Sequence, residues 1–232
     1  MGCCVFPTAQ QLSAELQWTQ IRLLASVLAV PAGLGVDFLA HVVPFQCRAW
    51  FRTTPTPSLM LPYSPTAAEG LDWLAGMSPG NVEEFTRAQT GEAAYRPLVE
   101  QLAQDAVAAA ESGGLAVADG YELAESDRSI LAAQARSPGH LFRVKATYTG
   151  GIDGCIDDGL AFTRPWGFDV TSISVPVSVW YGPEDSLCPR AHTDWLLRHI
   201  PGAQARELPG GHVLSGPSLH RLYGWLMQQP AN

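Results

Sequence analysis

Basic residues are scarce in this chain. It holds 14 Lys and Arg against 22 Asp and Glu, so its formal net charge is −8 at pH 7. Proteins that bind nucleic acid carry a basic patch that contacts phosphates, and an acidic protein is repelled by an anionic membrane surface. The charge balance therefore predicts neither a nucleic-acid partner nor a membrane partner.

Long hydrophobic runs and paired cysteines are also lacking. The apolar stretch 23–36 is too short to span a bilayer, and Pro31, Gly33 and Gly35 interrupt it. The five cysteines show no C-x-x-C spacing, and no Cys/His pairs recur at the spacing of zinc ligands. We therefore expect reduced thiols, no metal site and a cytoplasmic protein.

Apolar material is plentiful, and the chain divides by texture. Its 232 residues are 47% hydrophobic and 16% charged, which is enough to build a substantial core. Residues 1–58 form an atypical segment: an amphipathic run, an apolar patch broken by Gly and Pro, and a linker rich in Thr and Pro. Residues 59–232 read as the main folded part.

The middle of the chain is rich in helical patterns. Apolar residues recur at three- and four-residue spacing, which is the period of an amphipathic helix. Clusters of Gly, Pro and Ser separate these stretches, as turns do. The expected helices are 69–77, 82–89, 92–111 and 118–135.

From residue 173 the pattern becomes strand, helix, strand, helix. The run 175–181 is apolar nearly throughout, as a strand buried on both faces should be. A helix at 191–200, a strand at 204–208 and a helix at 218–228 follow. Strands that alternate with helices at this spacing predict parallel strands joined by crossovers, hence a protein of the α/β class.

One carboxylate and one imidazole follow these two strands. Asp185 ends a Gly-Pro-Glu-Asp loop after the first strand, and His212 ends Pro-Gly-Gly-His after the second. Ligands of open parallel sheets bind at the carboxyl ends of the strands. Neighbouring strands would bring both residues to one rim, where a carboxylate fixes the tautomer of an imidazole that acts as a base. Glu184 is the alternative acid.

The order of these pieces resembles the closing half of the α/β-hydrolase family. The ordered set, more than any one piece, carries the resemblance, and it covers about residues 59–232. It implies a partial α/β-hydrolase fold: a mostly parallel sheet with a helical cap insertion at about 67–149. The matching pieces are the Gly-Pro-Glu-Asp loop, Pro189, Ile-Pro-Gly-Ala at 200–203, Pro-Gly-Gly-His and the upstream segment 157–168.

The resemblance also implies a chemistry. Intact members hydrolyse ester, amide or related bonds of small-molecule substrates through an acyl-enzyme, without a metal or organic cofactor. Asp185 would orient His212, which would serve first as general base and then as general acid. Arg164 and Trp166 are candidates for the substrate pocket. The remaining histidines in the part of the chain that resembles the family are expected at the surface: His140, His192, His199 and His220.

A recognisable nucleophile is missing. The family places it before the acid, in Gly-x-Ser-x-Gly on a strand-to-helix turn. The one literal match centres on Ser78, but Pro79 has no N–H for the oxyanion hole, and a helix at 69–77 would precede it instead of a strand. Ser78 therefore reads as a loop residue at the start of the helix over 82–89.

The elbow expected from the fold falls near residues 30–35. There Ala32 stands at the nucleophile position, and Asp37 is an alternative carboxylate nucleophile without the second small flanking residue. The early strands of the family have no room in residues 1–58. A sheet that lacks them leaves an exposed edge, which predicts self-association into a homo-oligomer.

Three hypotheses follow. The first is an α/β-hydrolase-type hydrolase with an Asp–His pair, inactive if it has no nucleophile. The second is a truncated or frame-shifted, non-catalytic homologue that serves as a binding module. The third is a membrane-associated protein led by residues 1–45, which the broken apolar run disfavours.

Overall fold

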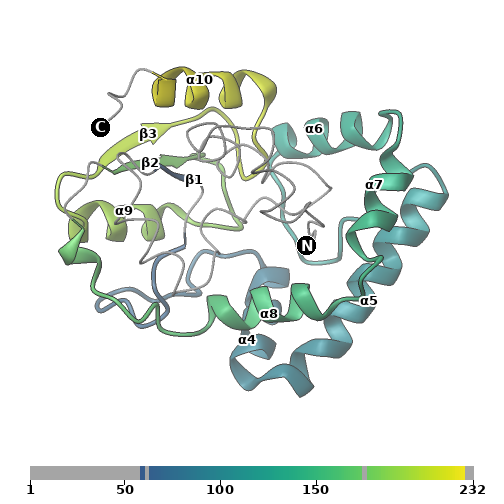
Figure 1. Ribbon diagram of the computed structural model, residues 1–232, viewed down its shortest axis with the longest axis horizontal. Helices are drawn as coiled ribbons and strands as arrows, with labels where there is room; N and C mark the ends of the chain where they lie inside the picture. Colours follow the sequence, from purple (N-terminus) through teal and green to yellow (C-terminus); the bar gives the residue numbers. More distant parts are fainter. Residues whose placement is uncertain (1–57, 61–62, 174–176, 228–232) are drawn as a thin grey trace, which may run out of the picture.

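The computed structural model describes residues 58–60, 63–173 and 177–227 (Figure 1). Nearly all of the atypical segment 1–58 lies outside these residues, and with it the expectations for Ala32 and Asp37. Within the described ranges, no helix is both long and apolar enough to cross a membrane.

Three parallel strands form the sheet. In spatial order they are β1 (Ser58–Met60), β2 (Ser178–Tyr181) and β3 (Gln204–Glu207). Their register pairs Met60 with Trp180, and Trp180 with Arg206. The predicted parallel pairing of the two late strands is thus confirmed.

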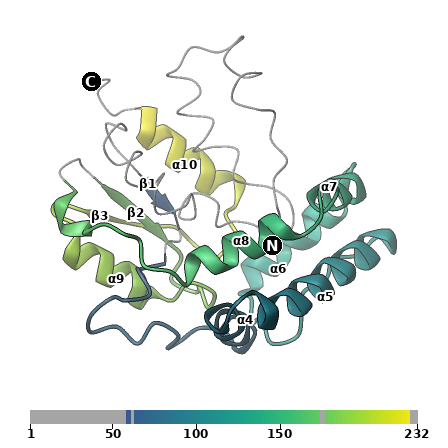
Figure 2. The same ribbon diagram turned by 60° about the horizontal axis from the view of Figure 1, so that its bottom comes forward.

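Helices cover both faces of this sheet (Figures 1 and 2). The helix α9 (Arg190–His199) connects β2 to β3, and α10 (Gly216–Met227) follows β3. Because successive side chains of a strand point to opposite faces, Val179 packs with the α9 side and Trp180 with the α10 side. All four residues of β2 are buried, as expected for a strand that is covered on both faces.

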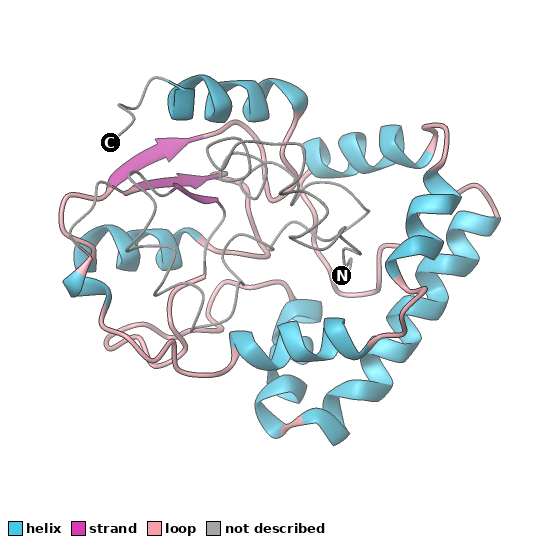
Figure 3. Cartoon of the chain, in the orientation of Figure 1, coloured by secondary structure: helices cyan, strands magenta, loops and turns pink. Residues whose placement is uncertain are grey.

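The middle of the chain forms a helical lobe beside the sheet (Figures 2 and 3). Tyr95 is fully buried where α4, α5 and α8 meet, in a cluster with Val99 and Ile156. The lobe consists of α4 (Pro79–Thr90), α5 (Glu92–Glu111), α6 (Glu125–Ala135), α7 (His140–Thr147) and α8 (Asp153–Phe162).

The prediction of a helix at 69–77 is wrong. This stretch is a series of turns, with Gly70 and Gly76 in the left-handed region at φ 76° and 81°. Trp73 is held by a long-range contact instead, because its Nε1 donates to the carbonyl of Ser64 at 2.9 Å. Tertiary anchoring of one aromatic residue thus outweighs a helical apolar spacing.

Other boundaries also differ from expectation. The helix at 92–111 is confirmed, and 82–89 lies inside α4. The helix predicted at 118–135 begins only at Glu125, after a turn that contains Gly120 at φ 83°. The helix α8 replaces part of the segment that was expected only to lead into the strand. Cys155 in α8 is disulfide-bonded, so the expectation of reduced thiols is wrong there.

The packing of α9 on the sheet generates a stability prediction. Leu196 is completely buried in the cluster around Val179, and we expect Leu196→Ala to lower the free energy of unfolding by about 2–5 kcal/mol. Leu197→Ala, at the partly exposed neighbouring position, should cost clearly less. Urea unfolding measures both, and equal losses would contradict the described orientation of α9.

Candidate active site

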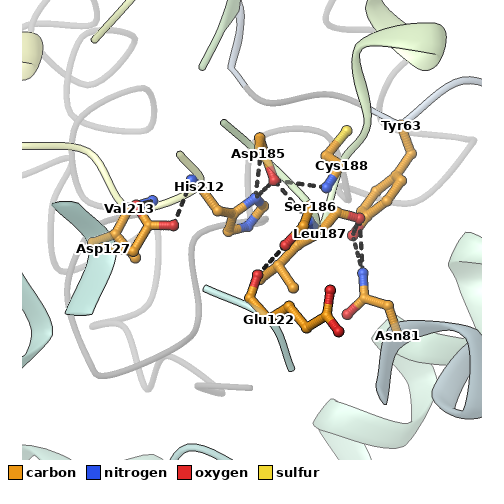
Figure 4. A network of polar contacts seen from close by, with 10 residues as sticks. All are labelled: Tyr63, Asn81, Glu122, Asp127, Asp185, Ser186, Leu187, Cys188, His212 and Val213. Atoms are coloured by element: carbon orange, nitrogen blue, oxygen red, sulfur yellow. Dashed lines mark hydrogen bonds and ion pairs between the residues drawn. The ribbon is translucent and has the colours of Figure 1, made fainter. Parts of the chain in front are cut away.

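Asp185 and His212 meet at the carboxyl ends of β2 and β3. The Nδ1 atom of His212 lies 2.9 Å from Oδ2 and 3.2 Å from Oδ1 of Asp185 (Figure 4). The side chain of His212 is 4% exposed and that of Asp185 is 1% exposed. Because a carboxylate only accepts, Nδ1 carries the hydrogen, and in the neutral ring Nε2 holds the basic lone pair.

The loop after β2 fixes the Asp185 carboxylate. Its Oδ1 accepts hydrogen bonds from the backbone N–H groups of Leu187 at 2.9 Å and Cys188 at 2.8 Å. The carbonyl of Leu187 in turn accepts from Tyr63 Oη and Asn81 Nδ2. The loop is thus fixed internally by the Asp185 carboxylate and externally by Tyr63 and Asn81.

Glu184 does not compete with Asp185 for this position. Glu184 is exposed, whereas Asp185 is buried. Of the two acids in the Gly-Pro-Glu-Asp loop, the structure places only Asp185 against the imidazole.

Three glycines allow the two loops to approach each other. A Cβ atom on Gly182 would overlap the carbonyl oxygens of Gly210 and Gly211. Gly210 has a φ of 101°, which side chains rarely tolerate. The glycines of both sequence motifs therefore have a physical reason: they let the acid loop and the histidine loop pack backbone against backbone.

A second carboxylate, which the sequence reasoning missed, holds the backbone of the histidine loop. Asp127 is 1% exposed, and its Oδ2 and Oδ1 accept from the N–H groups of His212 and Val213, both at 2.9 Å (Figure 4). A Cβ atom on Gly211 would overlap this carboxylate. No pattern within 118–135 signals that role, since an acid in the first turn of a helix is ordinary.

Arg164 and Trp166 are not brought to the Asp185–His212 pair by any contact between described residues. Arg164 is exposed. Trp166 packs against the apolar cluster on the α9 side of the sheet, with its ring centroid 5.7 Å from that of Phe168. Trp166 is thus placed at a packing junction, and the assignment of both residues to a substrate pocket stays a prediction.

The expectation of surface histidines is wrong for two of the four. His192 is completely buried, and its Nδ1 lies 3.2 Å from the backbone N of Ser64. His140 is also buried, with Nε2 3.1 Å from the carbonyl oxygen of Gly114. His199 is half-buried and stacks on Trp195, and His220 is exposed as expected.

Burial changes the ionisation of His192. Desolvation lowers its pKa from 6.5 to about 4, against smaller opposing contributions from the backbone of Trp73 and the charge of Asp185. The rings of Tyr63 and Trp73 contact it edge-on, with centroids 5.5 and 5.4 Å away. His192 is therefore neutral at pH 7 and part of the apolar interior.

Ser78 lies at the start of α4. It is 1% exposed, its backbone N–H donates to the carbonyl of Ser186 at 2.8 Å, and Pro79 is the first residue of the helix. Turns precede it over 72–77, with no strand in the described stretch 63–77. The prediction of a helix start is confirmed, although the helix expected before it is absent. Its Oγ has no hydrogen-bond partner among the described atoms.

Across the described residues, no three His, Cys, Asp or Glu side chains gather as metal ligands would. At the rim of the sheet, the buried carboxylate of Asp185 and the imidazole of His212 can perform general acid–base chemistry.

Comparison with known proteins finds similarity at the level of structure only. No protein-family profile and no curated protein sequence matches the chain. An esterase from Thermogutta terrifontis is 17% identical, with 85% of this chain and 63% of the esterase covered at a TM-score of 0.49. A bromoperoxidase from Bacillus anthracis is 14% identical, with 88% and 69% covered and a TM-score of 0.49. A hydrolase from Oleispira antarctica is 14% identical, with 78% and 60% covered at a TM-score of 0.45.

These neighbours are α/β-hydrolase-fold proteins, and the chain spans less than two thirds of the esterase's length. The parallel order β1-β2-β3, its helices on both faces and the adjoining helical lobe are those of a partial α/β-hydrolase fold.

The buried His192 predicts a pH dependence of stability. The unfolded chain takes up a proton near pH 6.5 and the folded chain only near pH 4, so stability is fully present above about 6.5 and is lost as the pH falls toward 4. Over this range the wild type should lose about 3 kcal/mol more than His192→Asn.

Urea unfolding at several pH values measures this difference. His220→Asn, which changes an exposed histidine, is the matched control and should follow the wild type. A His192→Asn variant with the pH dependence of the wild type would contradict a neutral, buried imidazole.

Proposed function

We propose that the protein is a hydrolase of the α/β-hydrolase type that cleaves an ester, amide or related bond of a small molecule. The observation that supports this most strongly is the buried hydrogen bond between His212 Nδ1 and Asp185. A carboxylate–imidazole pair on the loops after two adjacent parallel strands is the arrangement that makes Nε2 a general base.

In the proposed reaction, Nε2 of His212 removes the proton of a nucleophilic O–H group as its oxygen attacks the substrate carbonyl carbon. The resulting imidazolium then gives that proton to the leaving group as the bond to it breaks. Water repeats the sequence and releases the acid product. Asp185 keeps Nδ1 protonated and stabilises the positive ring, without taking the proton itself.

The nucleophile stays unassigned in this proposal. Ser78 is the literal motif match, but Pro79 provides no N–H at the position where an oxyanion donor is needed. Loss of one such donor typically costs about 100- to 1,000-fold in rate. This feature favours a second candidate function, a non-catalytic binding module that retains the fold.

Other parts of the proposal concern partners and location. We propose a protein that acts on small molecules and binds neither nucleic acid nor membranes; the disulfide of Cys155 does not support the cytoplasmic location expected from the sequence. Self-association through a sheet edge is also part of it, because β1 pairs with β2 on one side and with no second strand among the described residues.

A fluorophosphonate probe separates the hydrolase from the binding module. We expect stoichiometric labelling of one serine in the full chain, and a labelling rate at least about 100-fold lower in His212→Gln, because general-base assistance is lost. His220→Gln, on the exposed face of α10, should label like the wild type.

Peptide mapping of the labelled chain then distinguishes Ser78 from the other serines. Absence of labelling in the folded wild type would reject the serine hydrolase and favour the binding module. Equal labelling of His212→Gln and wild type would reject the role of His212 as base.

A further inference from the structure

Asp127 does not serve the helix to which it belongs. It is the third residue of α6, a position from which an acid often bonds back to the start of its own helix. The N-cap residue of α6 is Ala124, and no side-chain hydrogen bond caps this end of the helix. The Asp127 carboxylate instead points to the loop after β3. Its two oxygens accept hydrogen bonds from the backbone of His212 and Val213, which lie 85 and 86 positions further along the chain.

The same stretch of chain also holds the acid loop. The hydroxyl of Ser186, next to Asp185, donates to the carbonyl of Glu122, three residues before α6 (Figure 4). Residues 122–127 therefore bond to both loops of the candidate site: Glu122 to the loop of Asp185 and Asp127 to the loop of His212.

Apolar contacts run parallel to these bonds. Leu123 and Leu131 are 3% and 1% exposed, and they form one cluster with Leu187 and Val213. Leu187 stands two residues after Asp185, and Val213 directly follows His212. The start of α6 thus contacts the same two loops by polar and apolar groups.

The backbone of the histidine loop is shaped to receive the carboxylate. A side chain at position 211 would overlap Asp127, and one at position 210 would come within 2.8 Å of Ser126 Oγ. The second glycine of Pro-Gly-Gly-His therefore has a function beyond its own turn. It leaves the space through which α6 reaches the N–H groups of residues 212 and 213.

We propose that Asp127 is a positioning residue: by bonding to the backbone of His212 and Val213, it ties the helical lobe to the histidine loop and holds the imidazole in place against Asp185. Its consequence for catalysis rests on the proposed function, but the geometric claim does not.

Asp127→Asn tests this proposal, because an amide can accept from one N–H but presents a donor to the other. The imidazole of His212 is observed by ¹⁵N NMR of the full chain and assigned with His212→Gln. In the wild type we expect the Nδ1–H tautomer. In Asp127→Asn we expect a mixture of tautomers, because the backbone of His212 is no longer held in the position that places Nδ1 against Asp185.

Glu125→Gln is the matched control. Glu125 lies in the same first turn of α6, but its side chain is 87% exposed and pairs with Arg128 at 3.8 Å. It should leave the tautomer of His212 unchanged. An Asp127→Asn variant with the His212 signals of the wild type would overturn the proposal.

The wild-type chain carries a second test should Asp127→Asn fail to fold. The amide hydrogens of His212 and Val213 should be protected from exchange, because both donate to the Asp127 carboxylate. Exchange as fast as in an exposed loop would overturn the proposal. Neither measurement needs turnover, so failure of the fluorophosphonate experiment leaves this test intact.

Discussion

The structure of the candidate site depends on one buried contact, the hydrogen bond between the Asp185 carboxylate and the His212 imidazole. An ionised carboxylate out of water is costly unless donors surround it. Here the imidazole and two backbone N–H groups provide them. The parallel strands, the glycines between their loops and the bonds from the helical lobe all serve to keep these donors in place.

Close backbone packing is the constraint that links fold and site. Because Gly182 lies against the carbonyl groups of Gly210 and Gly211, neither loop can move far without disturbing the other. The helical lobe adds a third contact through Asp127. The site is thus built from three distant stretches of chain, and its geometry follows from their packing more than from any one of them.

Much of this arrangement could be predicted from the sequence, because strand ends are local signals. An apolar run followed by a turn and Asp185, and a second strand followed by Pro-Gly-Gly-His, place both residues at one rim once parallel pairing is assumed. The spacing of apolar residues alone likewise predicts the helix 92–111. In each case the sequence pattern is one that the local element, a buried strand or an amphipathic helix, itself requires.

The rest depends on contacts between distant residues, which spacing does not encode. Trp73 gives the stretch 69–77 a helical pattern, yet its ring is anchored to Ser64 and the backbone follows in turns. His192 sits on an amphipathic helix, but nothing in its sequence says that it faces the interior. Asp127 is an ordinary first-turn acid until α6 is placed beside the histidine loop.

The most direct test of the central contact is a double-mutant cycle on stability with Asp185→Asn, His212→Gln and the combined variant. A buried, hydrogen-bonded pair predicts a coupling free energy of about 1–3 kcal/mol at pH 7. Additive effects of the two substitutions, with a coupling near zero, would contradict the account, because side chains that do not contact each other lose their interactions independently.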